Sequence, residues 1–341
     1  MTERAPSLPH PQASPFGEVS RKRRRGRYPS RQAQNHTKKA GITLKNRAFL
    51  FVVIASICWG TSGVFSTYLN RCGLSGMENS LVRGGVSLLF VLLYALIFER
   101  SAFRITLSEL ALFAGIGLAL FGSGTAYFYA IPLTSNATAV VLMYTAPVIV
   151  AVVSALFFGE KFSRLKLISV GLMLLGCLFV SGVIGNLRGS VGGILLGLLS
   201  GVSYAAYNIL TKIAMRRGSS AMSATLYGFA FMTLLALLFA KPSVVLHAAK
   251  TSPLPAIPLM IGIGLVTFVA PYVLYTNAMK TLPAGTACAL SIIEPMAATV
   301  FSLILFDEIP TALSTVGIVL ILLAVLLLGR AQNMTGKEET K

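Results

Sequence analysis

Apolar residues gather in ten long segments, and short stretches with most of the charged residues separate them. The segments cover about 48–69, 77–98, 107–131, 136–158, 165–183, 191–213, 221–240, 257–279, 284–306 and 312–328. A helix of about 20 apolar residues is long enough to cross the hydrocarbon core of a bilayer. The pattern therefore predicts an all-α integral membrane protein with ten transmembrane helices.

The ninth segment repeats a pattern from earlier in the chain. It reads AGTACALSIIEPMAATVFSLILF and has Glu294-Pro295 at its centre, while YTAPVIVAVVSALFFGE places Pro147 148 positions before Pro295. Ala146 stands in the first copy where Glu294 stands in the second. Because each half has five spans, the halves enter the membrane in opposite directions. We therefore predict two inverted five-helix repeats, over 48–184 and 190–329, a plan common in secondary transporters.

Composition agrees with a membrane protein, since 55% of the 341 residues are hydrophobic and 12% are charged. The formal net charge is +18, and the first 47 residues hold 12 of the 29 Lys and Arg but two of the 11 acidic residues. We interpret 1–47 as a disordered basic cytoplasmic tail and 330–341 as a second cytoplasmic tail. This distribution favours anionic membrane lipids as partners and argues against nucleic acid.

Lys and Arg are unevenly divided between alternate loops, nine on one side and four on the other. The first side has Arg100, Arg104, Lys161, Arg164, Lys166, Lys212, Arg216, Arg217 and Lys280, and the other has Arg71, Arg188, Lys241 and Lys250. The positive-inside rule then predicts a multi-pass protein of the cell (inner) membrane with both termini in the cytoplasm.

Motifs of common enzymes are missing from the spans. There is no HExxH, GxSxG or GK[ST] sequence there, and the four cysteines lie singly. We expect neither an enzyme nor a cofactor or metal site. Gly193, Gly197 and Gly201 recur every four residues, which predicts a close helix contact in the sixth span.

Glu294 is the first candidate for a substrate cavity. A charge at the centre of a spanning helix costs about 3 kcal/mol on insertion scales, so such a residue faces a bundle interior or an aqueous cavity. Pro295 removes the amide partner of the Ser291 carbonyl, and Pro147 and Pro295 are both predicted to kink their helices. Glu294 is then either a proton- or cation-sensitive group or a carboxyl that serves packing alone.

Further cavity candidates are less sharply defined. Arg83 could balance Glu294, attract an anionic substrate or extend to the headgroups. Trp59 and Tyr204 occupy matching midplane positions, so with Asn208 one turn later they either hold a planar substrate or pack. Tyr144, at the start of the first repeated motif, completes the set. By contrast, a position near helix ends predicts an interfacial aromatic belt for Tyr127, Tyr129, Tyr272 and Tyr275.

Several elements together resemble the EamA family of the drug/metabolite transporter superfamily. They are WGTSGVF from Trp59, Arg83 early in the second span, APVIVAVVSALFFGE from Ala146 and its echo EPMAATVFSLILFDE. The resemblance implies a ten-helix inner-membrane carrier, often an exporter, with alternating access around a central cavity. One departure is Asp307-Glu308, where the first copy has Gly159-Glu160, and it leaves open whether the two loops share one geometry.

The sequence thus predicts a secondary transporter that exports a small organic metabolite or amino acid. Transport is either driven by an ion gradient, with a proton or sodium as the coupling ion, or runs as facilitated exchange. Multidrug efflux is the alternative within transport. A lipid scramblase and a membrane scaffold without transport activity are alternatives from other classes, and a homodimer is left open.

Overall fold

The computed structural model describes residues 31–134, 136–160, 163–184, 190–307 and 309–338. The chain divides into two units, Met1–Lys39 and Ala40–Lys341. Helix α1 begins at Arg31, so the predicted disorder over 1–47 falls partly on helical residues and otherwise, over 1–30, outside the described residues. Gln, Lys and Ala before the first span are good helix formers, which lets the membrane helix extend toward the N-terminus.

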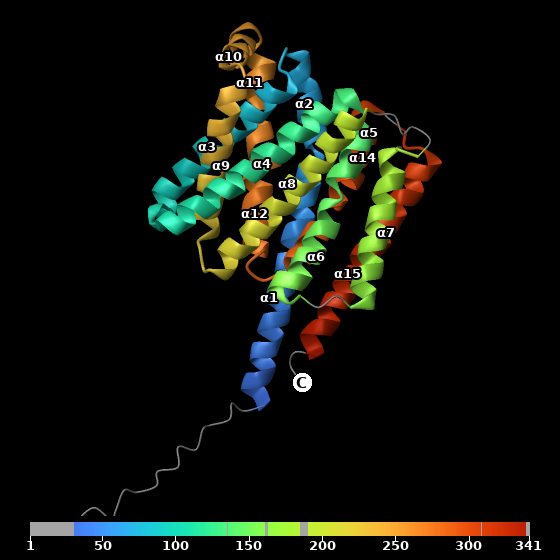
Figure 1. Ribbon diagram of the computed structural model, residues 1–341. Helices are drawn as coiled ribbons and strands as arrows, with labels where there is room; N and C mark the ends of the chain where they lie inside the picture. The colour runs from blue at the N-terminus through green and yellow to red at the C-terminus, as the bar shows by residue number, and fades with distance from the viewer. Residues whose placement is uncertain (1–30, 135, 161–162, 185–189, 308, 339–341) are drawn as a thin grey trace, which may run out of the picture. The chain divides into compact units, whose positions relative to one another are not determined.

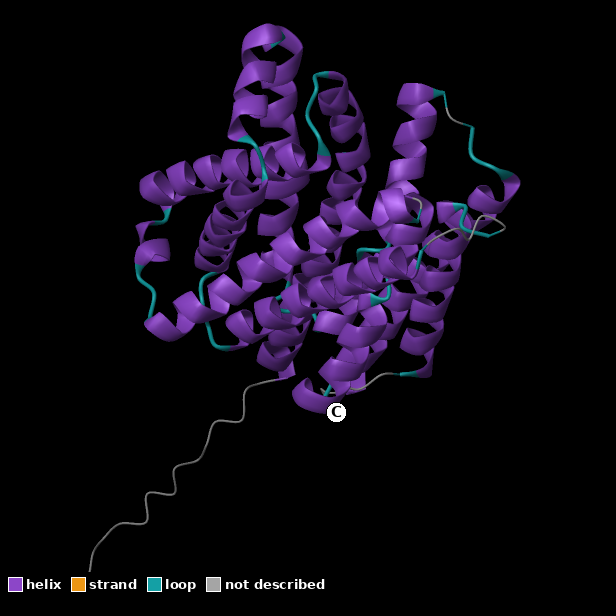
Figure 2. Ribbon diagram, turned by 45° about the horizontal axis from the view of Figure 1, so that its top comes forward, coloured by secondary structure: helices purple, strands orange, loops and turns teal. Residues whose placement is uncertain are grey.

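All secondary structure in the described part of the chain is helical (Figure 2). The first half contains α1 (Arg31–Gly60), α2 (Ser62–Arg71), α3 (Gly76–Phe98), η1 (Arg100–Phe103), α4 (Leu107–Leu133), α5 (Asn136–Met143), α6 (Ala146–Phe158) and α7 (Arg164–Ser181). The second half contains α8 (Val191–Arg216), α9 (Ala221–Phe239), α10 (Pro242–Thr251), α11 (Pro253–Gly264), η2 (Leu265–Val269), α12 (Ala270–Ala278), α13 (Ala284–Leu290), α14 (Ile293–Phe306) and α15 (Ala312–Glu338).

The prediction of ten spans is confirmed. Among the described residues, ten stretches are helical, long and apolar enough to cross a membrane, and the ninth has the predicted bounds, Ala284–Phe306. The eighth begins at Pro253, four residues before the predicted start, because proline is well suited to the first turn of a helix. The short helix α10 was not predicted.

Helices of the two halves pack directly on each other. Helix α4 lies along α8, and α7 lies along α15, as Figure 1 shows for the α7 and α15 ribbons. Large apolar side chains such as Leu118, Leu238 and Leu326 are more than half exposed. In a membrane this surface contacts lipid chains, so the buried helix faces can be rich in small and polar residues.

The ends of α6 and α14 share one geometry despite the sequence departure noted above. Gly159 and Asp307 both adopt the left-handed conformation, with φ of 64° and 55°, and each donates its amide to the serine carbonyl five residues earlier. Glycine favours this conformation, and Asp tolerates it better than most residues. The open question about the two loops is therefore answered at this residue, while Glu308 lies outside the described residues.

The glycine spacing in α8 corresponds to a close helix contact. A Cβ atom on Gly201 would lie 2.5 Å from the Thr145 hydroxyl oxygen and 2.7 Å from the Leu142 carbonyl oxygen, and one on Gly197 would lie 2.6 Å from Leu142. Only glycine therefore allows α8 to approach the break between α5 and α6.

We expect Gly201→Ala to destabilise the protein by about 1–3 kcal/mol, because the added methyl overpacks against a backbone carbonyl that does not move freely. Thermal unfolding of the purified protein in detergent measures this. Gly192→Ala on the same helix is the control, since its Cβ would approach no neighbouring atom closer than 4.0 Å. Equal unfolding temperatures for the two variants would contradict the contact.

Candidate functional site

Two membrane helices are interrupted at equivalent positions of the two repeats. The fourth span breaks between α5 and α6, and the ninth between α13 and α14. Each break is followed by a proline, Pro147 or Pro295. Proline lacks an amide N–H and its ring displaces the carbonyl four residues earlier, which disrupts a straight helix. The breaks lie against each other, because Tyr144 in the first bonds to Ser291 in the second.

Glu294 lies at the second break and is bonded to the opposite repeat. Its Oε2 accepts a hydrogen bond of 2.8 Å from the Tyr144 hydroxyl, which also lies 3.2 Å from the Ser291 carbonyl oxygen. That carbonyl is the one whose amide partner Pro295 removes. Ser56 reaches the adjacent Leu290 carbonyl at 3.3 Å. The Ser291 carbonyl also accepts the Glu294 amide at 2.9 Å, so one tyrosine of the first repeat joins the carboxyl group and this carbonyl of the second.

A cavity of about 1140 Å³ lies above this junction. Glu294, Tyr144, Trp59 and Tyr204 line its deep part. Residues at helix ends line its mouth, among them Asn70, Ser75, Gly182 and Thr311. These residues lie after odd-numbered spans or before even-numbered ones, and all such positions are on the same face of the membrane. The cavity therefore opens on the face opposite the loops rich in Lys and Arg. Within the described residues, Arg83 and Glu294 are the two charged residues of its lining.

Aromatic side chains form the floor of the cavity. The Trp59 ring lies 5.2 Å from the rings of both Tyr272 and Tyr275, and Tyr204 stacks on Tyr207 at 6.1 Å. Tyr272 lies on α12, directly after the π-helical turn η2, a type of distortion frequent at functional sites. The cavity therefore ends on a tightly packed layer of rings rather than continuing through the protein.

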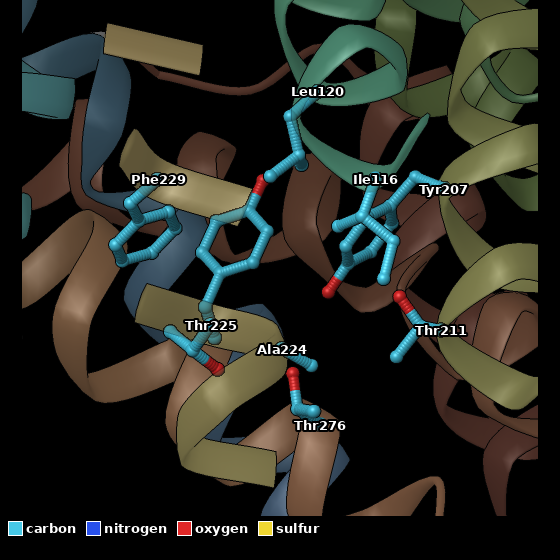
Figure 3. A pocket seen from close by; sticks show the side chains of 9 residues that line it. Ile116, Leu120, Tyr207, Thr211, Ala224, Thr225, Phe229 and Thr276 are labelled. Carbon is cyan, nitrogen blue, oxygen red and sulfur yellow. The ribbon is translucent and has the colours of Figure 1, made fainter. Parts of the chain in front are cut away.

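Below this layer lies a second, much smaller cavity of about 10 Å³ (Figure 3). Tyr272 lines both cavities, and Tyr207, Thr211 and Thr276 contribute hydroxyl groups to the smaller one. The Tyr207 and Thr211 hydroxyl oxygens are buried and have no hydrogen-bond partner in the described structure. The small cavity has about the volume of one water molecule, so the aromatic layer separates the large cavity from a narrow polar space.

The expectation of an interfacial belt is wrong for three of its four tyrosines. Tyr275 is fully buried, Tyr272 belongs to the floor and Tyr127 lines the cavity. Tyr129 also belongs to the cavity lining, but it is 52% exposed. Counting residues from a helix end estimates depth in the membrane but does not say which way a side chain faces. On α12 the positions of Tyr272 and Tyr275 share one face, three residues apart, and that face points inward.

The structure separates Asn208 from the other candidates. Its Nδ2 donates to the Tyr204 carbonyl at 2.7 Å, its Oδ1 accepts from the Tyr275 hydroxyl, and the side chain is fully buried outside the cavity lining. The first bond lies within α8 and fixes the side chain, and the second connects α8 to α12, so both polar atoms are used within the bundle. Asn208 positions the aromatic floor, while Trp59 and Tyr204 line the cavity itself.

Arg83 of α3 turns toward the cavity. Its guanidinium carbon lies 4.8 Å from the centre of the Phe268 ring and 5.6 Å from that of Phe128. The Nε atom is buried and has no hydrogen-bond partner among the described residues. The sequence left several positions open for Arg83, and the structure places it in the cavity lining rather than at the headgroups.

The end of the bundle away from the cavity mouth is closed by charged groups. Lys212 Nζ donates to the carbonyl oxygens of Met279 and Leu282 at 2.9 and 2.6 Å. Glu160 accepts from the Ala284 amide at 2.9 Å and lies 3.9 Å from Lys166. A lysine next to the last carbonyls of one helix and a carboxylate at the first amide of another both favour the helix dipoles. These contacts tie the end of α6 to the start of α13.

Lys212 was counted only as a loop cation in the sequence. It nevertheless falls inside the predicted span 191–213, and a lysine inside a predicted span was a signal that it has a partner in the bundle. The tertiary structure supplies this partner as two carbonyl groups. Among the described residues, no group of three His, Cys, Asp or Glu side chains is arranged to hold a metal ion.

The helical bundle of two five-span halves around a central cavity is the architecture of a multi-pass membrane transporter. Comparison of sequences then identifies the family. The EamA-like transporter family matches residues 46–182 and again residues 191–330, and the chain belongs to this family.

Similar proteins agree with this assignment. An uncharacterized transporter of Archaeoglobus fulgidus is 32% identical over 63% of this chain and 76% of its own length. Uncharacterized transporter YwfM of Bacillus subtilis is 25% identical over 83% of this chain and 93% of its own. A solved crystal structure with 18% identity superposes with a TM-score of 0.68 over 82% of this chain and 95% of its own, which supports the fold.

Proposed function

We propose that the protein is a secondary transporter that moves a small organic metabolite or an amino acid outward across the cytoplasmic membrane by alternating access. One observation carries the proposal: the central cavity reaches one face of the bundle and is closed toward the other. A carrier in one of its two end states has this form, because the site then communicates with one side of the membrane at a time.

The size and lining of the cavity favour a small organic solute. Sites for small molecules usually measure about 300–1,000 Å³ and have apolar walls with a few placed polar groups. The cavity of about 1140 Å³ has aromatic walls and one charge of each sign in its described lining. Such a lining suits a polar or zwitterionic metabolite better than a purely apolar drug, which favours metabolite transport over multidrug efflux.

The contacts at the closed end support alternating access. Glu160 belongs to the first repeat and Ala284 to the second, so their bond must break if the halves separate at this end. We infer that this bond and the Lys212 contacts form the inner seal of an outward-open state. Opening the seal while the mouth of the cavity closes would expose Glu294 and Tyr144 to the other side.

The Tyr144–Glu294 contact suggests a proton as the coupling ion, with sodium as the alternative. When Glu294 is ionised, the Tyr144 hydroxyl donates to it. When Glu294 is protonated, its O–H can donate to the tyrosine oxygen, and the tyrosine proton is then directed to the Ser291 carbonyl. The change in protonation thus rearranges the bonds between the two breaks, at the point where the repeats meet.

The membrane orientation rests on the loop charges and is tested with fused reporters. We expect reporters after Arg217 and at the C-terminus to be cytoplasmic and one after Lys250 to be external, because one span, α9, separates the turn at Arg217 from α10. Two reporters are fused at each position, one active only in the cytoplasm and one active only outside the cell. The reporter that is active gives the location of that position. An external C-terminus would overturn the orientation and, with it, the outward-open assignment.

Counterflow in liposomes tests the proposed function. Proteoliposomes loaded with an unlabelled amino acid or organic acid should accumulate the labelled compound only when the protein is present and the two compounds match. Movement of labelled lipid without solute would identify a scramblase. Absence of both activities in protein that retains its fold would favour a membrane scaffold.

A further inference from the structure

Arg83 is a half-buried cation whose Nε atom is fully buried and receives no partner from the described part of the chain. Buried arginines are normally paired with carboxylates or carbonyls, because an isolated buried charge is costly. Within the described residues, Arg83 takes part in no ion pair within 4.0 Å, and its Nε has no hydrogen-bond partner. Glu294, the other charged residue of the described lining, is bonded to Tyr144 instead. The guanidinium group is therefore available to a partner from outside the chain.

Two aromatic rings hold the guanidinium in place. Phe268 lies 4.8 Å and Phe128 5.6 Å from the guanidinium carbon, distances at which cation–π attraction operates. Stacking of this kind uses the flat faces of the group and leaves its N–H edge for hydrogen bonding. Gly124 lies beside the group, since a Cβ at this position would be in ordinary contact with an Arg83 Nη, at 3.8 Å.

We propose that Arg83 binds the carboxylate of the transported compound through two parallel N–H···O bonds, and that this compound is a small organic monocarboxylate with an aromatic or apolar body. A planar guanidinium matches the two oxygens of a carboxylate. The aromatic floor around Trp59 and Tyr272 then contacts the body of the ligand. This inference deepens the proposed function and rests on it.

The charge of the lining distinguishes a carboxylate from a phosphate group. In the described lining, Arg83 and Glu294 contribute one positive and one negative charge. A doubly charged phosphate ester, whether free or on a lipid headgroup, would meet a single cation and be repelled by an ionised Glu294. A monoanion is balanced by Arg83 and is repelled less by Glu294, because it carries a single charge. The binding experiment therefore includes a lipid with a phosphate headgroup as a third ligand.

Fluorescence of Trp59 gives a direct measure of binding, because it is the single tryptophan of the chain and lines the cavity. Purified protein in detergent is titrated with 3-phenylpropanoate, with its neutral analogue 3-phenylpropanamide, and with a short-chain phosphatidic acid. We expect a saturable change with the carboxylate and at least about tenfold weaker binding of the amide, since a site built for a charged hydrogen bond rejects a ligand without it. The lipid should bind no better than the amide.

Substitutions assign the effect to the guanidinium. Arg83→Gln should weaken carboxylate binding about tenfold or more and leave amide binding unchanged, and Arg83→Lys should recover part of the loss because it keeps the charge without the paired geometry. Arg71→Gln is the matched control, since Arg71 also lies over an aromatic ring, that of Tyr68, but outside the cavity lining. Unchanged amide binding shows that the Arg83 variants remain folded.

The proposal is overturned by equal binding of carboxylate and amide, by full carboxylate binding in Arg83→Gln, or by preference for the lipid phosphate. Absence of any saturable change with the carboxylate overturns it too. Because the titration needs no transport, it separates two failures. Carboxylate binding without counterflow would contradict the proposed function and leave the Arg83 site in place. Counterflow that does not depend on a carboxylate would contradict the Arg83 site and leave the proposed function in place.

Discussion

Replacing Glu294 with glutamine is expected to preserve folding and substrate binding and to abolish the pH dependence of transport. Glutamine has nearly the same shape and still accepts a hydrogen bond from Tyr144 through its amide oxygen. It cannot exchange a proton, however, so the two bonding arrangements at Tyr144 and Ser291 are reduced to one. Under the proposed mechanism, the variant remains able to exchange substrate but no longer couples this exchange to a proton.

Transport measured in liposomes between about pH 5.5 and 8.5 tests this expectation. The wild-type rate should change with pH and the Glu294→Gln rate should stay flat. Glu294→Ala should in addition weaken binding if the carboxylate holds a substrate amine. Glu99→Gln is the control, because Glu99 is bonded to Ser220 outside the cavity lining and should keep the wild-type profile. A normal pH profile in Glu294→Gln would mean that Glu294 serves packing.

Tyr144→Phe separates the carboxyl group from its partner. The hydroxyl that joins Glu294 to the Ser291 carbonyl is lost, while the ring remains in its buried position. If the bonding change at this junction transmits protonation to the helix breaks, Tyr144→Phe should flatten the pH profile as Glu294→Gln does. If the transport rate of Tyr144→Phe still depends on pH, protonation of Glu294 acts through a contact other than the one with Tyr144.

Removing the Glu160 carboxylate is expected to open the closed end of the bundle. Glu160→Ala deletes the bond to the Ala284 amide, which connects the repeats, and the attraction to Lys166. A hydrogen bond to a charged group contributes about 1.5–3 kcal/mol, so the balance between the two end states should shift about 10- to 100-fold toward the inward-open state. Glu160→Gln keeps an acceptor for the amide and should shift this balance less.

Cys288 is a natural reporter for this opening. It is completely buried on α13, between the seal at Ala284 and the break before α14. In a variant that keeps Cys288 as its only cysteine, labelling by a membrane-impermeant thiol reagent from the cytoplasmic side should become about tenfold faster with Glu160→Ala. Arg164→Ala, which removes an exposed cation nearby, should not alter the rate. Unchanged labelling in Glu160→Ala would show that the contact is not a seal.

Much of the architecture followed from the sequence. Lipid chains form no hydrogen bonds with the backbone, so a single apolar stretch spans the membrane as a helix. Ten such stretches were therefore recognisable in the sequence. The repetition of the Pro147 motif at Pro295 indicated two halves, and an odd number of spans in each gave their inversion. The position of Glu294 in the middle of a span marked it as a candidate, since a charge at that depth is costly.

The sequence did not show which side chains meet. In a soluble helix the apolar stripe identifies the buried face, but a membrane helix is apolar toward lipid and toward its neighbours alike. Tyr272 and Tyr275 were therefore assigned to the membrane surface although they form the cavity floor, and Lys212 was assigned to a loop although it bonds to two carbonyls.

By itself, then, the sequence determined the number of spans, the duplication and the depth of each residue, because these depend on counting along a single helix. The tertiary structure decided that Tyr144 is the partner of Glu294, that Arg83 faces the cavity beside Phe268, and that one end of the bundle is closed. These contacts depend on how each helix is rotated and tilted against its neighbours. Packing between helices sets that rotation, and a pattern that is apolar on every side contains little information about it.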